Sequence, residues 1–250
     1  SEGNVLAQDV ASYTVIAYLS ETRTKSLTNP QHVIAKEATA KALAPILNMT
    51  EERLLELLSK DLYQVELGPG GRGITELVKE EMESLNLPGI DFIETFKRFY
   101  PNGNFASYVI GYAKKYEKLD ENGKTFEKII GELGLESKYN ELLTGENGYL
   151  KYQQDRFGYK IPDTKEEKVE AINGSDVYLT LDSNIQRFAE SAIKDIEETY
   201  SPKWATIAVM DAKNGDILAA STIPSFDPNI KNISNYQSPL VTYKFEPGST

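Results

Sequence analysis

Ser249 is the residue whose type and setting could do chemistry, because it follows a proline and a glycine where a helix is expected to begin. It lies in KFEPGST, the last seven residues of the 250-residue chain. The glycine eases a turn, and a serine in this place can cap the first amides of a helix. The same unpaired amides, at the positive end of the helix dipole, could stabilise an oxyanion. Two interpretations of Ser249 stay open, a helix cap and a nucleophile, and the segment is either a frayed tail or the first turn of a helix.

A serine nucleophile also needs a base. The one histidine of the chain, His32, stands beside Pro30 at an expected helix entry, far from Ser249 in the sequence, so the inventory excludes a Ser-His-Asp arrangement. A lysine three residues after the serine would lie one helical turn along and beside the hydroxyl. That position falls two residues after Thr250.

For the other polar clusters in the sequence, a structural role is expected and not catalysis or ligand binding. The glycine-rich loop Gly68–Gly73 lacks the Gly-Lys-Ser/Thr ending of a P-loop, which predicts a plain loop. The acidic runs at 51–52 and 80–83 lie on expected amphipathic helices, where carboxylates normally face water. Without cysteine and with one histidine, the chain offers neither a disulfide nor a thiolate or imidazole metal site. We therefore expect no metal and no cofactor.

Charge and composition limit the partners. The chain has 27 Lys+Arg against 38 Asp+Glu, a net charge of −11, and no clustered basic face for nucleic acid. Its apolar fraction of 40% is ordinary for a globular protein. No apolar run approaches the roughly 20 residues that span a bilayer, and the N-terminus lacks the features of a signal peptide. As given, the chain is therefore expected to be soluble. Because it begins at Ser1 without a methionine, this expectation leaves open an anchor removed upstream.

In the first half of the chain, hydrophobic periodicity predicts a strand and three helices. The strand covers 12–19 and the helices cover 35–47, a segment that Thr50 caps, and 74–86, which Pro88-Gly89 closes. The second of these helices should bury Leu54, Leu55 and Leu58. Residues 90–112 are expected to be extended around a tight turn at 101–103.

Farther along, we expect short helices at 126–133 and 138–143, paired strands within 148–155 and 158–162, and an exposed connector at 163–168. A strand over 177–182 should lead into a helix that Asp182 or Ser183 caps and that ends near Pro202. Its buried stripe is expected to contain Ile185, Phe188, Ala189, Ala192, Ile193 and Ile196. A hairpin of 205–212 and 216–222 follows, joined through Asn214-Gly215.

In the order of its segments the chain resembles the class B penicillin-binding proteins, whose active site begins with a Ser-x-x-K motif. There the motif usually reads Pro-Gly-Ser-Thr, an apolar residue and Lys, and residues 247–250 match its first four positions. Of the family's earlier Arg-Gly-x-Ile-x-Asp-Arg-Asn-Gly signature, only Gly3 could remain. The closest likeness is to division-type enzymes of Gram-positive bacteria. Five further stretches are similar to family segments: NVLAQDVASYTVIAYL, FYPNGNFASYVIGYA, GELGLESKYNELLTGENGYL, GSDVYLTLDSNIQRFAE and VMDAKNGDILAASTIPSFDPN.

The resemblance implies an α+β fold in two domains. Residues 1–172 would be an elongated pedestal of the dimerisation type. Residues 173–250 would be the N-terminal part of a transpeptidase domain, an α+β fold like that of serine β-lactamases, truncated after the catalytic serine. The base lysine, the Ser-x-Asn loop and the Lys-Thr-Gly strand would lie downstream, so we expect residues 1–250 alone to be inactive.

The resemblance also implies the chemistry and the partners of the parent protein. Ser249 would be the acyl-enzyme nucleophile of peptidoglycan cross-linking on D-Ala-D-Ala stem peptides, and β-lactams would acylate the same residue. An N-terminal anchor would hold the parent at the outer face of the cell membrane. An alternative is a pedestal that serves mainly as an interaction module for a glycan polymerase or other division proteins. A third hypothesis, a β-lactam sensor or β-lactamase, is disfavoured because those proteins need no long spacer.

Overall fold

The computed structural model describes residues 3–26, 28–119, 125–151, 153, 166–231 and 233–244. The chain divides into two compact units. One unit is the continuous segment Asp9–Lys97, and the other combines Ser1–Gln8 with Arg98–Thr250. Each mixes helices and strands, which confirms the expected α+β class.

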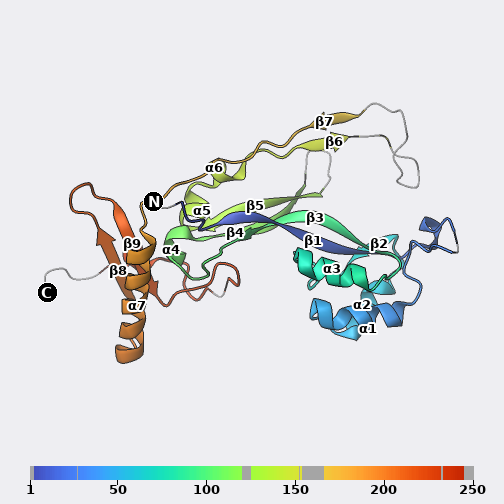
Figure 1. The fold of residues 1–250 in the computed structure, drawn as a ribbon, viewed down its shortest axis with the longest axis horizontal. Helices are drawn as coiled ribbons and strands as arrows, with labels where there is room; N and C mark the ends of the chain where they lie inside the picture. The colour runs from blue at the N-terminus through green and yellow to red at the C-terminus, as the bar shows by residue number, and fades with distance from the viewer. Residues whose placement is uncertain are drawn as a thin grey trace. The chain divides into compact units, whose positions relative to one another are not determined.

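The continuous unit packs helices on a small sheet (Figure 1). Its sheet has the strand order β2-β1-β3, and β1 pairs antiparallel with β2. The strand expected at 12–19 is confirmed in type as β1, and the helix expected at 35–47 is confirmed as α1. The elements are β1 (Gln8–Tyr18), a short 3₁₀ helix (Glu21–Arg23), α1 (Lys36–Leu47), α2 (Glu51–Leu58), β2 (Gln64–Glu66), α3 (Glu76–Ser84) and β3 (Ile90–Phe99).

Side-chain caps fix where two of these helices begin. The Thr50 hydroxyl accepts a hydrogen bond from the backbone N–H of Arg53, as expected for the start of α2. The Thr75 hydroxyl accepts one from Val78 and starts α3 at Glu76, two residues later than expected. α3 ends at Ser84, and Asn86 has a positive φ of 48°, which a continuing helix does not allow.

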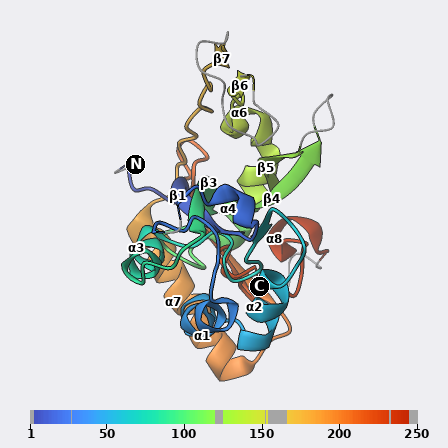
Figure 2. The ribbon, with the colours of Figure 1, turned by 90° about the vertical axis from the view of Figure 1, so that its right-hand side faces the viewer.

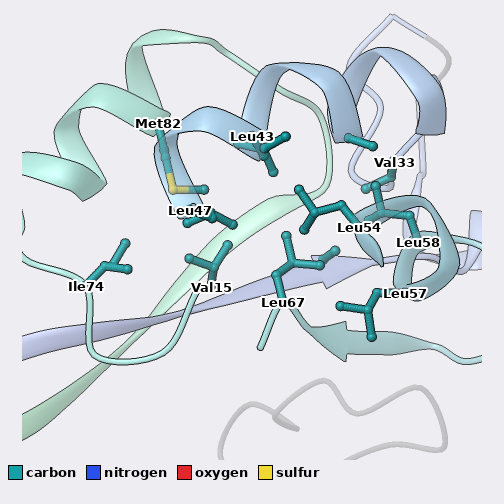
Figure 3. Packing of buried hydrophobic residues seen from close by; sticks show 13 residues of the cluster. Val15, Val33, Leu43, Leu47, Leu54, Leu57, Leu58, Leu67, Ile74 and Met82 are labelled. Atoms are coloured by element: carbon teal, nitrogen blue, oxygen red, sulfur yellow. The ribbon is translucent and has the colours of Figure 1, made fainter. Parts of the chain in front are cut away.

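The core of this unit lies between β1 and the three helices. Figure 3 shows Leu43 and Leu47 of α1, Leu54 of α2 and Val15 of β1 pointing toward one another. Leu43, Leu54 and Val15 are fully buried. The face of α2 differs by one residue from expectation, because Leu57 is buried and Leu55 only packs against the edge of the cluster. In a core packed this closely, the loss of even one methylene group lowers the stability of the fold.

The second unit begins with an antiparallel hairpin and a pair of short strands. β4 pairs with β5, and β6 with β7; both views of the ribbon show β6 and β7 side by side (Figures 1 and 2). The elements are α4 (Ser107–Ile110), β4 (Tyr112–Leu119), β5 (Thr125–Leu133), α5 (Gly134–Lys138), α6 (Asn140–Thr144), β6 (Tyr149–Lys151) and β7 (Glu167–Val169).

Several expectations in this region are wrong. Residues 126–133 form strand β5 rather than a helix, because their backbone pairs along the whole of β4, for example Ile129 opposite Lys115. Residues 90–112 are not extended throughout, since α4 interrupts them. β6 pairs with β7, so Glu167 and Lys168 of the expected connector lie in a strand. The partner strand expected at 158–162 lies outside the described residues.

The last part of this unit holds one long helix and a hairpin, seen side by side in Figure 1. Its elements are α7 (Ser183–Tyr200), β8 (Ala205–Met210), β9 (Ile217–Ile223) and α8 (Pro239–Thr242). The helix start at Asp182, its end before Pro202 and the antiparallel hairpin are confirmed. No strand forms over 177–182, where one backbone hydrogen bond, from Asp182 N–H to Leu218 O, joins the segment to β9.

The buried stripe of α7 is also partly wrong. Ala189 and Ile193 are buried as expected, but Phe188 is 76% exposed and Ile196 is 36% exposed. The fully buried side chain of the helix is the polar Gln186. No helix in the described parts of the chain is both long and apolar enough to cross a membrane.

Leu54→Ala should destabilise the chain by about 2–5 kcal/mol, because it removes a fully buried side chain and leaves a cavity. Leu77→Ala makes the same change on α3, where the side chain is 77% exposed, and should change stability by less than about 0.5 kcal/mol. The free energy of unfolding can be measured by urea denaturation followed by circular dichroism. Equal losses in the two variants would contradict the assigned core.

Candidate functional site

Ser249 and the residues around it, 245–250, lie outside the described residues. The described chain ends at Lys244, five residues before the serine. The structure therefore tests neither the cap nor the nucleophile interpretation of Ser249. What it does describe is the framework that carries the chain up to this segment: α7, the β8–β9 hairpin, the loop after β9 and α8.

A buried amide fixes α7 against the hairpin. The Asp182 carboxylate accepts hydrogen bonds from the N–H groups of Asn184 and Ile185, which sets the first turn of the helix. One turn on, Gln186 Oε1 accepts from Ala220 N–H at 2.8 Å and Gln186 Nε2 donates to Ala220 O at 3.1 Å. Both ends of the amide are thus paired with the backbone of one residue in β9.

The network continues through carboxylate and hydroxyl groups. Gln186 Nε2 also lies 2.9 Å from Ser221 Oγ and donates to Glu190 Oε1 at 2.8 Å. The same carboxylate oxygen accepts from the backbone N–H of Ala106, at 2.8 Å. Ala106 has a positive φ of 46° and is the residue before α4. Helix α7, strand β9 and the turn before α4 therefore meet at one buried polar cluster.

The loop after β9 is held by an aromatic cluster. Phe226 is buried together with Tyr100, Phe105 and Tyr112, and its ring meets that of Tyr108 edge to face, with centroids 5.0 Å apart. Burial raises the pKa of Tyr100, whose hydroxyl accepts a hydrogen bond from Ala113 N–H at 2.7 Å.

An amide on the same loop brackets the backbone of Tyr100. Asn229 Oδ1 accepts from Tyr100 N–H at 3.0 Å, and Asn229 Nδ2 donates to Tyr100 O at 2.9 Å. The loop thus makes the same kind of two-ended amide contact that Gln186 makes with β9.

Two tyrosines hold the last described residues of the chain in place through Asn235. The Tyr108 hydroxyl donates to the backbone oxygen of Asn235 at 2.9 Å. Asn235 Nδ2 donates to the Tyr243 hydroxyl at 2.8 Å, and the Tyr243 ring lies edge to face with Trp204 at 5.4 Å. Burial, and next the neighbouring Tyr243, raise the pKa of Tyr108. Tyr108 therefore stays protonated near neutral pH and can donate its hydrogen bond.

The other residues singled out in the sequence have local partners. His32 Nδ1 lies 2.6 Å from the Thr24 hydroxyl. Arg72, in the glycine-rich loop, pairs with Glu66 at 2.8 Å, and the loop backbone bonds to β1 through Val15 N–H and Gly71 O. Among the described residues, no group of three or more acidic or histidine side chains could hold a metal ion.

Sequence patterns missed the polar contacts that build this framework. Gln186 interrupts an apolar stripe, and nothing in the periodicity says whether it faces the core. Tyr108, Asn235 and Tyr243 are spread over 136 residues, from 108 to 243, and no spacing rule connects them. The one available signal was the segment FYPNGNFASYVIGYA, which includes Tyr108 and which stands out as similar to family sequences.

Comparison with known protein families gives two matches. Residues 1–179 match the penicillin-binding protein dimerisation domain, and residues 205–250 match the penicillin-binding protein transpeptidase domain. The two matches leave 180–204 between them. The expected division at 172/173 stays a prediction.

Similar proteins are known in several bacteria. The chain is 34% identical over 230 residues to stage V sporulation protein D of Bacillus subtilis, covering 88% of this chain and 33% of that protein. It is 33% identical to the probable peptidoglycan D,D-transpeptidase PenA of Neisseria gonorrhoeae, covering 71% of this chain and 29% of that protein. The chain thus spans about a third of the curated relatives it matches.

A solved structure supports the same likeness. The fold is similar to that of penicillin-binding protein 2X from Streptococcus thermophilus, with a TM-score of 0.63 and 33% identity. The similarity covers 90% of this chain and 34% of that one.

Gln186→Leu should destabilise the chain by about 2–4 kcal/mol, because it leaves the backbone groups of Ala220 and the Glu190 carboxylate without their buried donor or acceptor. Gln64→Leu, the same change at an exposed position of β2, should have little effect. Urea denaturation of both variants checks this. A neutral Gln186→Leu would mean that water or a local shift replaces the amide.

Proposed function

Because this chain belongs to the class B penicillin-binding proteins, we propose that it is the pedestal and the first part of the transpeptidase domain of a serine D,D-transpeptidase, with Ser249 as nucleophile. The observation that carries the proposal is the transpeptidase match over residues 205–250, which ends in Pro247-Gly248-Ser249-Thr250. The similarity to a relative named as a probable peptidoglycan D,D-transpeptidase supports it.

The proposed reaction is an acyl transfer through a covalent ester. The Ser249 hydroxyl oxygen attacks the carbonyl carbon of the terminal D-Ala-D-Ala peptide bond, its proton passes to a base, and D-alanine leaves with a proton on its amine. The amine of a neighbouring stem peptide then attacks the ester, which forms the cross-link and returns the proton to Ser249. A β-lactam presents a similar amide, and its opened ring stays attached to the serine.

The base and most of the substrate-binding groups belong to positions after Thr250. In the Ser-x-x-K motif the lysine follows the serine by three residues, which puts it at position 252 of a chain that continues. A serine without a base is a weak nucleophile at neutral pH. Residues 1–250 alone are therefore catalytically silent in this proposal, and activity belongs to the longer protein.

The place and the type of the parent protein are part of the same proposal. It is a division-type enzyme of a Gram-positive bacterium, held at the outer face of the cell membrane by a helix that precedes this chain. Its substrates are peptidoglycan stem peptides, and its inhibitors are β-lactams.

A second function, binding of a glycan polymerase or another division protein by the pedestal, is favoured by strand β3. In the part of the chain that the structure describes, β3 lies at the edge of its three-stranded sheet. It carries the exposed side chains Ile93 and Phe96, which are 51% and 55% exposed. An edge strand with apolar side chains can pair with a strand of another protein.

The test of the proposed nucleophile is covalent labelling by a penicillin. The protein that continues past Thr250 should gain the mass of one penicillin, and peptide mapping should place it on Ser249. Ser249→Ala should abolish the adduct, whereas Ser191→Ala, which removes an exposed hydroxyl of α7, should leave it intact. Residues 1–250 alone should gain no mass. An adduct that persists in Ser249→Ala would overturn the assignment.

The second function has its own test with a purified glycan polymerase. Phe96→Asp should weaken binding of the pedestal about tenfold or more, because it places a charge in an apolar contact. Leu77→Asp makes the same kind of change at a side chain of α3 that is 77% exposed, and should bind normally. Equal binding by both variants would exclude the β3 edge as the contact.

A further inference from the structure

A short line of hydrogen-bonded groups joins α4 to Tyr243, near the end of the described chain. It begins at Tyr108 of α4, passes through the backbone oxygen and the side-chain amide of Asn235, and reaches the hydroxyl of Tyr243. The two hydrogen bonds measure 2.9 and 2.8 Å. Tyr243 follows α8 directly and stands six residues before Ser249 in the sequence.

Both ends of this line are anchored. The Tyr108 ring packs edge to face on the buried Phe226, so its hydroxyl has a fixed direction. The Tyr243 ring packs edge to face on Trp204, the residue before β8. Asn235 is held as well, since its Oδ1 accepts from Gln237 N–H at 3.0 Å. These contacts thus fix the position of Tyr243 and the direction in which the chain leaves α8.

We propose that Tyr108, acting through Asn235 and Tyr243, is a positioning residue for the serine-bearing segment. In this role Tyr108 acts on the chain and not on the reacting atoms, by limiting where the chain after Tyr243 can go. Acyl transfer depends on such control, because a nucleophile displaced by about 1 Å can lose roughly 100-fold in rate. Tyr108 belongs to the span matched by the dimerisation domain, so a residue of the pedestal segment would set the geometry of the transpeptidase segment.

The partial burial and the protonation of these groups support this role. The side chains of Tyr108, Asn235 and Tyr243 are partly buried, so both hydrogen bonds are shielded in part from water. Since burial raises the pKa of Tyr108, the phenol keeps its proton well above neutral pH. Replacing Tyr108 by Phe keeps the ring packing on Phe226 and deletes only the donor to Asn235. This makes Tyr108→Phe a selective probe of the line.

The first measurement needs only the 250-residue chain. Trp204 is its single tryptophan, so its fluorescence reports the packing of Tyr243 without interference. Tyr108→Phe should raise the quenching of Trp204 by acrylamide and shift its emission to longer wavelength, with the circular dichroism spectrum unchanged. Tyr116→Phe is the matched control, since it deletes a phenol that donates to Glu132 at 2.8 Å on the exposed hairpin β4–β5.

The second measurement uses the protein that continues past Thr250 and rests on the proposed function. For penicillin acylation, Tyr108→Phe should lower the first-order acylation rate about two- to tenfold, the range expected for the loss of one hydrogen bond, and leave the dissociation constant of the non-covalent complex unchanged. Tyr243→Phe should lower it by a similar factor. The double variant should lose no more than the larger single loss, because both changes break the same line.

The outcomes separate the two proposals. If the unmodified protein is not acylated at Ser249, the proposed function fails, whatever Tyr108 does. If the protein is acylated and Tyr108→Phe matches both the unmodified protein and Tyr116→Phe in rate and in Trp204 quenching, the positioning role is overturned. A loss of stability in Tyr108→Phe with an unchanged acylation rate would also overturn it, because that pattern belongs to a purely structural residue.

Discussion

The amide of Gln186 is the contact on which the second unit depends. A helix and a hairpin can pack through apolar side chains at many relative heights, because dispersion and hydrophobic burial have little direction. An amide that pairs with both backbone groups of Ala220 allows only one position of α7 along β9. A shift by one residue along β9 would leave the amide without these partners, because the backbone N–H and C=O groups of the next residue point to the other edge of the strand. Burial of Gln186 makes that error costly.

The contacts of Gln186 connect to two further sets of contacts in this unit. Through Glu190 it reaches Ala106 and the turn that begins α4, so the helix that carries Tyr108 is tied to α7. Through β9 it reaches the loop with Phe226 and Asn229, which close over Tyr100. Both directions meet again at Asn235, where Tyr108 bonds to the loop. The described chain up to Tyr243 is thus held by a closed set of contacts, whose parts restrain one another.

Local signals made much of the fold predictable from the sequence, and long-range pairing explains the failures. Thr50, Asp182 and the Asn214-Gly215 turn each act within a few residues, so their structural roles follow from local chemistry. Residues 126–133 carry apolar and charged side chains that suit a helix as well as a strand, and only the partner strand β4 decides. The apolar pattern of α7 failed at Phe188 because periodicity gives a face but not what covers it.

The candidate site divides in the same way between local and distant information. Proline, glycine and serine in sequence predict a helix start, yet many helix starts carry a serine that only caps. What distinguishes Ser249 is its place in an order of segments that matches two domains of one family. The framework before it required the structure, because Tyr108, Asn235 and Tyr243 become neighbours only after the chain has folded. Under the proposed function the nucleophile depends on two parts of the polypeptide, one that supplies its base and one that fixes its position, and we assign the described residues to the second.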